Sequence, residues 1–150
     1  LSSFATSTGT HIIYRPHLND DIDQTGYPNI HILPASEFPD TEEILYITDV
    51  LICDWSSIAF DFLLLERPTL FIDSDPPFQK GFTLGSNFRF GPVIDNLDNL
   101  LEVLKIVCVA PTVILDEHRG QMQSVREIVY DDNADGYATE RCAELIEKVA

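Results

Sequence analysis

Short apolar runs alternate along the chain with longer stretches of helical periodicity. Five runs predict strands, most of them ended by a proline or a polar residue, and four stretches predict helices. The predicted strands cover residues 11–15, 29–33, 50–53, 69–72 and 92–94, and the predicted helices cover residues 41–48, 56–66, 97–109 and 138–149. Alternation of strands and helices predicts an α/β fold, in which a parallel sheet lies between two layers of helices.

Three local features refine this pattern. Asp40 or Thr41 is the expected N-cap of the helix over residues 41–48. The helix over residues 56–66 is apolar nearly all round, so we expect it to be buried, with Asp61 as its one interruption. Residues 73–91 form the one long irregular stretch, and a loop of that length in a compact domain is usually functional.

Composition narrows the class of protein. The 150 residues are the size of one domain, residues 1–150, and 45% hydrophobic content excludes a disordered chain. A formal net charge of -16 argues against binding to nucleic acids or to an anionic bilayer surface. Three cysteines without a CxxC pair favour a reducing compartment. The first ten residues lack the pattern of a signal peptide. The chain begins with leucine and runs directly into serine and threonine residues, as expected of a piece of a longer protein.

The end of the third predicted strand is the most informative stretch. Residues 50–53 run directly into Asp54 and Trp55, and Ser56 and Ser57 then open a predicted helix. Ligands of parallel sheets bind at the carboxyl ends of strands, and helix N-terminal amides beside two hydroxyls suit a phosphate or diphosphate. Serine is also a preferred N-cap, so a purely structural role stays open. Asp61 favours the functional role slightly, because it needs a polar neighbour.

A second candidate site follows the first predicted strand. Arg15 and His17 flank Pro16, which restricts the backbone and holds both side chains near one sheet edge. The pair could bind phosphate, with His17 donating a hydrogen bond or a proton. A structural salt bridge for Arg15 and a surface position for His17 explain the spacing equally well. The remaining histidines lack metal-ligand spacing, are interpreted as structural, and give no metal site: His11, His31 and His118.

The order of these residues resembles the C-terminal half of the CDP-glycerol glycerophosphotransferases. That family builds the poly(glycerol phosphate) of teichoic acids and related envelope polymers. The resemblance runs from about residue 12 to residue 146 and rests on Arg15-Pro16-His17, the stretch TDVLICDWSSIAFD over residues 48–61, Glu66-Arg67-Pro68, Lys80-Gly81-Phe82, Gly91-Pro92-Val93 and Asp135-Gly136 with Arg141. Three positions depart from the family pattern: Leu18 for a proline, Trp55 for a tyrosine and Thr83 for an aromatic residue.

The resemblance implies a fold and a set of site residues. The family fold is GT-B-like, with an active site between two Rossmann-type lobes, and residues 1–150 would be the C-terminal, donor-binding lobe. The resemblance implies His17 as the catalytic residue at the phosphate end of the donor. The implied donor and phosphate contacts are Arg15, Ser56, Ser57, Asp61 and Arg119, with Lys80 and Gly81 in the framing loop. No cofactor and no metal is implied beyond the substrate CDP-glycerol.

The implied reaction transfers glycerol phosphate from CDP-glycerol to the hydroxyl of an envelope polymer or lipid-linked acceptor, and CMP is released. The family works in the cytoplasm, at the inner face of the cell membrane. An N-terminal lobe would supply a further histidine that activates the acceptor. We therefore expect this chain alone to bind nucleotide weakly and to turn over little or nothing, because transfer requires both reactants to be positioned.

Three alternatives remain. A lobe of the same GT-B type could use a UDP-sugar, since phosphate contacts are shared among such enzymes. A response-regulator receiver would use Asp54 as phosphoacceptor after Asp20 and Asp21, but Lys105 falls inside a predicted helix. A degenerate lobe kept as an interaction module is disfavoured by the intact polar residues of both candidate sites.

Overall fold

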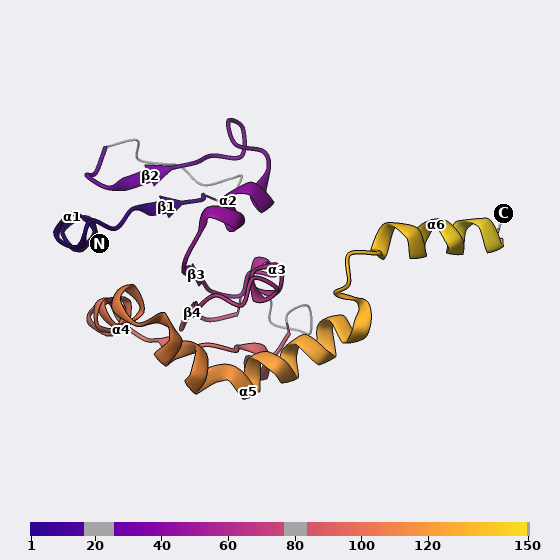
Figure 1. The fold of residues 1–150 in the computed structure, drawn as a ribbon. Coiled ribbons are helices and arrows are strands. Elements are labelled where there is room, and N and C mark those ends of the chain that lie inside the picture. The colour runs from indigo at the N-terminus through magenta and orange to yellow at the C-terminus, as the bar shows by residue number, and fades with distance from the viewer. Residues whose placement is uncertain (17–25, 77–83, 150) are drawn as a thin grey trace. The chain divides into compact units, whose positions relative to one another are not determined.

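The computed structural model describes residues 1–16, 26–76 and 84–149. The chain forms two compact units, Leu1–Thr48 and Asp49–Ala150. Both contain parallel strands and helices, so the predicted α/β class is confirmed (Figure 1). The single sheet expected from the sequence is not what the described strands form. They pair as a two-stranded sheet in the first unit and a three-stranded sheet in the second.

The first unit is built on two short strands. β1 (Ile12–Tyr14) pairs in parallel with β2 (Ile30–Ile32), and Ile12 lies opposite Ile30. The helix α1 (Ser2–Thr8) precedes them and was not predicted. It ends at Gly9, whose positive φ of 70° is a conformation that glycine adopts without strain.

The helix of the first unit begins where the sequence predicted. In α2 (Thr41–Ile47), Asp40 is the N-cap, and its carboxylate accepts a hydrogen bond from the Glu43 amide. Glu42 and Glu43 lie in the first turn, where negative charge is favourable. The expected cap is therefore confirmed.

The second unit contains a parallel sheet whose central strand is almost completely buried. Its strands are β3 (Leu51–Cys53), β4 (Thr69–Ile72) and β5 (Val93–Ile94), in the order β3-β4-β5. Leu51 lies opposite Thr69, and Phe71 lies opposite Val93. All three strands point the same way, so their carboxyl ends share one edge of the sheet, at which ligands of such folds bind.

Helices and two short 3₁₀ segments make up most of the rest of this unit. They are α3 (Ile58–Leu63), η1 (Ser86–Phe88), α4 (Leu97–Val109), α5 (Pro111–Tyr130), η2 (Asp131–Asn133) and α6 (Ala138–Val149). The helix predicted over residues 56–66 is shorter, because its last amides bond three residues back and Glu66 has a positive φ of 53°. Within the described residues, no helix combines the length and apolar character of a membrane span.

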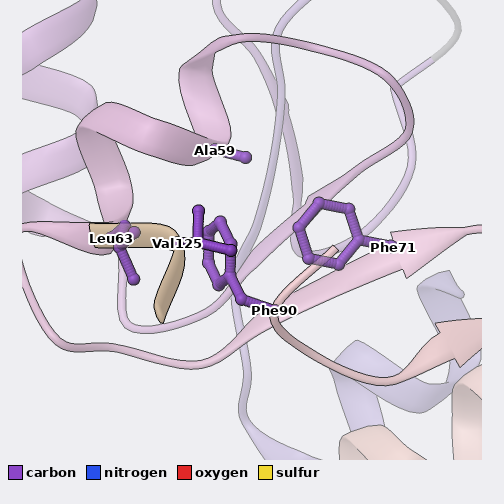
Figure 2. Packing of buried hydrophobic residues seen from close by; sticks show 5 residues of the cluster. All are labelled: Ala59, Leu63, Phe71, Phe90 and Val125. Carbon is purple, nitrogen blue, oxygen red and sulfur yellow. The ribbon is translucent and has the colours of Figure 1, made fainter. Parts of the chain in front are cut away.

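One hydrophobic cluster joins these elements. Figure 2 shows the five buried side chains of this cluster. Ala59 and Leu63 come from α3, Phe71 from β4, Val125 from α5 and Phe90 from the segment before β5. The rings of Phe71 and Phe90 are 5.2 Å apart and nearly perpendicular, an arrangement that aromatic pairs prefer. The cluster therefore fixes the approach to β5 against β4 and α3.

Gly91 lets the approach to β5 lie directly against β4. A Cβ atom at this position would lie 1.9 Å from the carbonyl oxygen of Thr69, which is a backbone atom and cannot rotate away. Thr69 is itself buried, at 3% exposure. Only glycine fits here without displacing one strand from the other.

The substitution Gly91→Ala should therefore destabilise the chain by at least about 2 kcal/mol, as expected for overpacking against a backbone atom. Chemical denaturation measures this change. Gly120→Ala is the matched control, because Gly120 lies within α5 and its Cβ would meet nothing within 4 Å. The control should raise stability by up to about 1 kcal/mol through helix propensity. Equal effects of both substitutions would contradict the packing constraint.

Cys53 ends β3 and packs against the hydrophobic cluster. Burial, followed by the charge of Asp54, raises the pKa of the Cys53 thiol from its ordinary value of 9.0 to about 12, and the positive charge of Arg89 opposes this shift. The thiol therefore stays protonated at neutral pH. It is packed as an apolar side chain and is not a nucleophile.

We expect Cys53 to react with iodoacetamide on the order of a hundredfold more slowly than an exposed cysteine, because the thiolate is the reactive form. Cys108 and Cys142 are exposed and serve as internal references in the same molecule. Mass spectrometry of peptides after timed alkylation measures the three rates. Labelling of Cys53 as fast as the references would contradict the burial of its thiol.

Candidate functional site

The turn after β3 places two serine hydroxyls at the surface. Asp54 and Trp55 form a bend, and Ser56 and Ser57 then lead into α3. Ser57 occupies the N-cap position but makes no capping bond with its side chain. The carbonyl oxygens of Ser56 and Ser57 accept the amides of the first helical turn instead. Since the Ser57 hydroxyl is not used as a cap, it stays available for an external acceptor. The diphosphate contact remains a prediction.

Trp55 ties this turn to the end of β4. Its indole Nε1 donates a hydrogen bond of 2.8 Å to the carbonyl oxygen of Ser74. The guanidinium carbon of Arg89 lies 4.2 Å from the centre of its ring, which is a cation–π distance. Two segments, one after β4 and one before β5, therefore hold the residue that directly precedes Ser56.

Arg89 is the residue of this region that sequence reasoning missed. Its side chain is only 8% exposed, and its terminal nitrogens donate to Asp73 Oδ1 at 3.2 Å and to the carbonyl oxygen of Ile72 at 3.3 Å. Nothing in the pattern of residues 73–91 distinguishes it, since that stretch has no periodicity. The one usable signal is the unusual tryptophan at position 55, which provides a surface for a cation.

Asp61 is exposed and lies near the end of α5. The expected polar neighbour is Tyr130: burial raises the pKa of the Tyr130 hydroxyl, and the negative charge of Asp61 raises it further. The side chain is on the short helix that begins directly after Ser57. Its predicted contact with the donor remains a prediction.

Arg15 directly follows β1, in the first unit, and its guanidinium is engaged by protein atoms. One terminal nitrogen donates to the carbonyl oxygens of Leu33 and Phe38, and the other donates to Thr41 Oγ1 at 3.1 Å. These bonds join the end of β1 to the segment after β2 and to the start of α2. They show a structural role, and the predicted phosphate contact remains a prediction.

The other predicted site residues divide between those that the structure describes and those that it does not. Arg119 lies in α5, is 65% exposed at its side chain and pairs with Asp116 one turn earlier. His17, Lys80 and Gly81 lie outside the described residues. The expectations for these residues stay predictions.

Two of the histidines interpreted as structural lie side by side. Nδ1 of His11 is 2.9 Å from Nε2 of His31, so one ring nitrogen donates a hydrogen bond to the other. Both residues are exposed at the two-stranded sheet. Within the part of the chain that the structure describes, no three histidine, cysteine, aspartate or glutamate side chains gather as a metal site would require.

Each of two further stretches that carry the family resemblance contains a residue that forms an ion pair. Arg126 donates to Glu66 Oε1 at 2.9 Å and so links α5 to the turn after α3. Arg141 binds both carboxylate oxygens of Asp135, at 2.9 Å and 2.8 Å. The amide of Tyr137, and then Arg141, hold the pKa of Asp135 below its usual range. These residues act locally as structural clamps.

Comparison with known proteins gives consistent matches. The sequence profile of the family described as CDP-glycerol:poly(glycerophosphate) glycerophosphotransferase matches residues 1–148. A teichoic acid poly(glycerol phosphate) polymerase of Staphylococcus epidermidis is 31% identical over 149 residues, covering 91% of this chain and 19% of that protein. A teichoic acid poly(ribitol-phosphate) polymerase of Bacillus spizizenii is 30% identical over 117 residues, covering 74% of this chain and 17% of that protein.

The same relation appears among solved structures. The wall teichoic acid polymerase TagF matches with a TM-score of 0.72 and 24% identity, over 99% of this chain and 38% of that chain. At this identity the match establishes the fold. The chain spans only 17% and 29% of the length of the first two curated relatives. The profile match over nearly every residue decides the family: this chain belongs to the CDP-glycerol:poly(glycerophosphate) glycerophosphotransferases.

Proposed function

We propose that residues 1–150 are the donor-binding lobe of a CDP-glycerol glycerophosphotransferase, the C-terminal half of a GT-B-type fold with two Rossmann-like lobes. Family membership supports the chemistry, and the match to TagF supports the fold. The observation that carries the assignment is the exposed Ser56–Ser57 pair at the carboxyl end of β3. The proposed substrate of this site is CDP-glycerol, and a TagF structure soaked with CDPG is among the matches.

Hydroxyl donors account for most of the proposed binding. The Ser56 and Ser57 hydroxyls would donate hydrogen bonds to the diphosphate oxygens. α3 has only six residues, so its dipole contributes less than that of a long helix. Arg15, Asp61 and Arg119 are further proposed contacts, by family resemblance.

The proposed reaction is attack by an acceptor hydroxyl oxygen on the β-phosphorus of CDP-glycerol. A bond forms between that oxygen and phosphorus, and the bond from phosphorus to the bridging oxygen of CMP breaks. The acceptor proton goes to a base in the other lobe, and CMP leaves with its phosphate stabilised by positive groups of this lobe. His17 is the proposed catalytic residue at the phosphate end of the donor.

The rest of the enzyme is proposed from the lengths of the relatives. Because the chain spans a minor part of each relative, we propose an N-terminal lobe that holds the acceptor, an envelope polymer or a lipid-linked precursor. The full protein would act in the cytoplasm, as a peripheral protein at the inner face of the membrane. With a formal net charge of -16 on this lobe, a basic membrane-binding surface would belong to the other part.

Titration with three nucleotides tests the nature of the donor. CDP-glycerol and CMP should shift the NMR signals of the Ser56 and Ser57 amides, whereas UDP-N-acetylglucosamine should leave them unchanged. Shifts caused by the UDP-sugar and not by cytidine ligands would replace the proposal with the UDP-sugar alternative. Shifts confined to other parts of the chain would contradict the proposed diphosphate site at Ser56 and Ser57.

Removing both hydroxyls tests their energetic contribution. The double variant Ser56→Ala with Ser57→Ala should weaken CDP-glycerol binding by about 1–3 kcal/mol, as expected for hydrogen bonds to a charged group. Isothermal titration calorimetry measures the loss. Ser124→Ala is the matched control, because Ser124 is an exposed serine in α5. An unchanged affinity in the double variant would rule out the hydroxyls as diphosphate donors.

A further inference from the structure

We propose that Arg89 is a positioning residue, which holds the Trp55-Ser56-Ser57 turn in the geometry that receives the donor. Its effect on donor binding rests on the proposed function, whereas its effect on the turn does not. Arg89 lies 34 positions after Trp55 in sequence, and the packing of the second unit brings the two together.

The contacts of Arg89 form a bridge between two strand ends. Its guanidinium covers the Trp55 ring at 4.2 Å, while the same group donates to Asp73 and to the carbonyl oxygen of Ile72. Trp55 in turn donates to the carbonyl oxygen of Ser74. Two interactions of Trp55 therefore hold the turn after β3 against the segment after β4: the stacking of its ring on Arg89 and the hydrogen bond from its indole to Ser74.

The backbone of Arg89 is itself held in place. Its amide donates to the carbonyl oxygen of Ser86, and its neighbour Phe90 is 2% exposed within the hydrophobic cluster. Gly91 then lies against the Thr69 carbonyl oxygen. The side chain thus starts from a fixed point, so it can fix the position of the tryptophan.

Stability alone is a weak explanation for a cation at this place. A buried charge loses hydration, and replacing a buried ion pair by apolar residues is often neutral or stabilising. Arg89 Nε and Ser74 Oγ are both buried without a hydrogen-bond partner among the described residues. An arginine whose burial is incompletely compensated fits a role in holding the turn better than a role in holding the fold.

The charge of Arg89 also acts at the turn. It opposes the upward shift of the Cys53 pKa, so its field reaches the last residue of β3. A positive charge at this edge of the sheet favours an anionic ligand there. Arg89 would therefore support the proposed diphosphate site at Ser56 and Ser57 by its geometry and by its charge, without a hydrogen bond to the donor.

Three variants separate geometry from charge. Arg89→Met removes both the charge and the contacts of the guanidinium. Arg89→Lys keeps the charge but loses the planar guanidinium, which stacks on Trp55 and donates two hydrogen bonds. Arg126→Met is the matched control, because Arg126 is an arginine of the same unit that pairs with Glu66 away from this turn. Circular dichroism first establishes that each variant is folded.

Two readouts need no ligand. Trp55 is the one tryptophan of the sequence, so its fluorescence reports the stack directly. In Arg89→Met we expect stronger quenching of Trp55 by acrylamide and about tenfold faster hydrogen exchange of the Ser56 and Ser57 amides, because the turn opens more often. Arg89→Lys should be intermediate, and Arg126→Met should match the unmodified chain.

The third readout is calorimetric titration with CDP-glycerol. Arg89→Met should raise the dissociation constant about tenfold through lost preorganisation, with a smaller rise in Arg89→Lys. Unchanged quenching, exchange and affinity in a folded Arg89→Met would overturn the proposal. If Arg89→Met does not fold, Arg89→Lys and Asp73→Ala decide, and unaltered exchange in both would overturn it. Failure of the unmodified chain to bind CDP-glycerol would instead count against the proposed function.

Discussion

The close approach of the segment before β5 to β4 is the constraint on which the second unit depends. Gly91 permits it, because any side chain there would collide with the Thr69 carbonyl oxygen. Phe90 then enters the hydrophobic cluster, and Arg89 reaches the Trp55 ring. One glycine at a backbone contact therefore sets the position of a cation that is part of the candidate site, so fold and site share a cause.

Local patterns in the sequence were sufficient for most elements. The apolar runs predicted all five strands of the described residues, and Asp40 was correctly placed as a cap. α1 and α5 were missed for physical reasons. α5 is much more polar than α4 and only its Ile114 and Val125 are buried, so it presents few apolar positions from which to predict a helix, and α1 is too short to show a period. Separation of the strands into two sheets depends on long-range pairing, which alternation of elements does not encode.

The candidate site divides along the same line. Ser56 and Ser57 were found because a strand, a turn and a helix start are adjacent in sequence. Arg89 was missed because its meaning comes from a contact across 34 positions, within a stretch that has no repeating pattern. Arg15 was found at its strand end, but its three acceptors lie on segments that sequence reasoning did not bring together. The sequence therefore indicated the site residues that lie next to one another in the chain, but not the contacts that form only when distant segments pack together.

Charge explains why a single buried arginine matters in so acidic a chain. Nine lysines and arginines face 25 aspartates and glutamates, and several of the cations are occupied by the protein. Arg119, Arg126 and Arg141 each pair with a carboxylate, which removes most of their field at a distance. Arg89 also pairs with a carboxylate, but its side chain is buried while its partner Asp73 is 60% exposed, so water screens its charge less than theirs. An anionic donor approaching this edge of the sheet would therefore meet neutral hydroxyl donors backed by one well-placed positive charge.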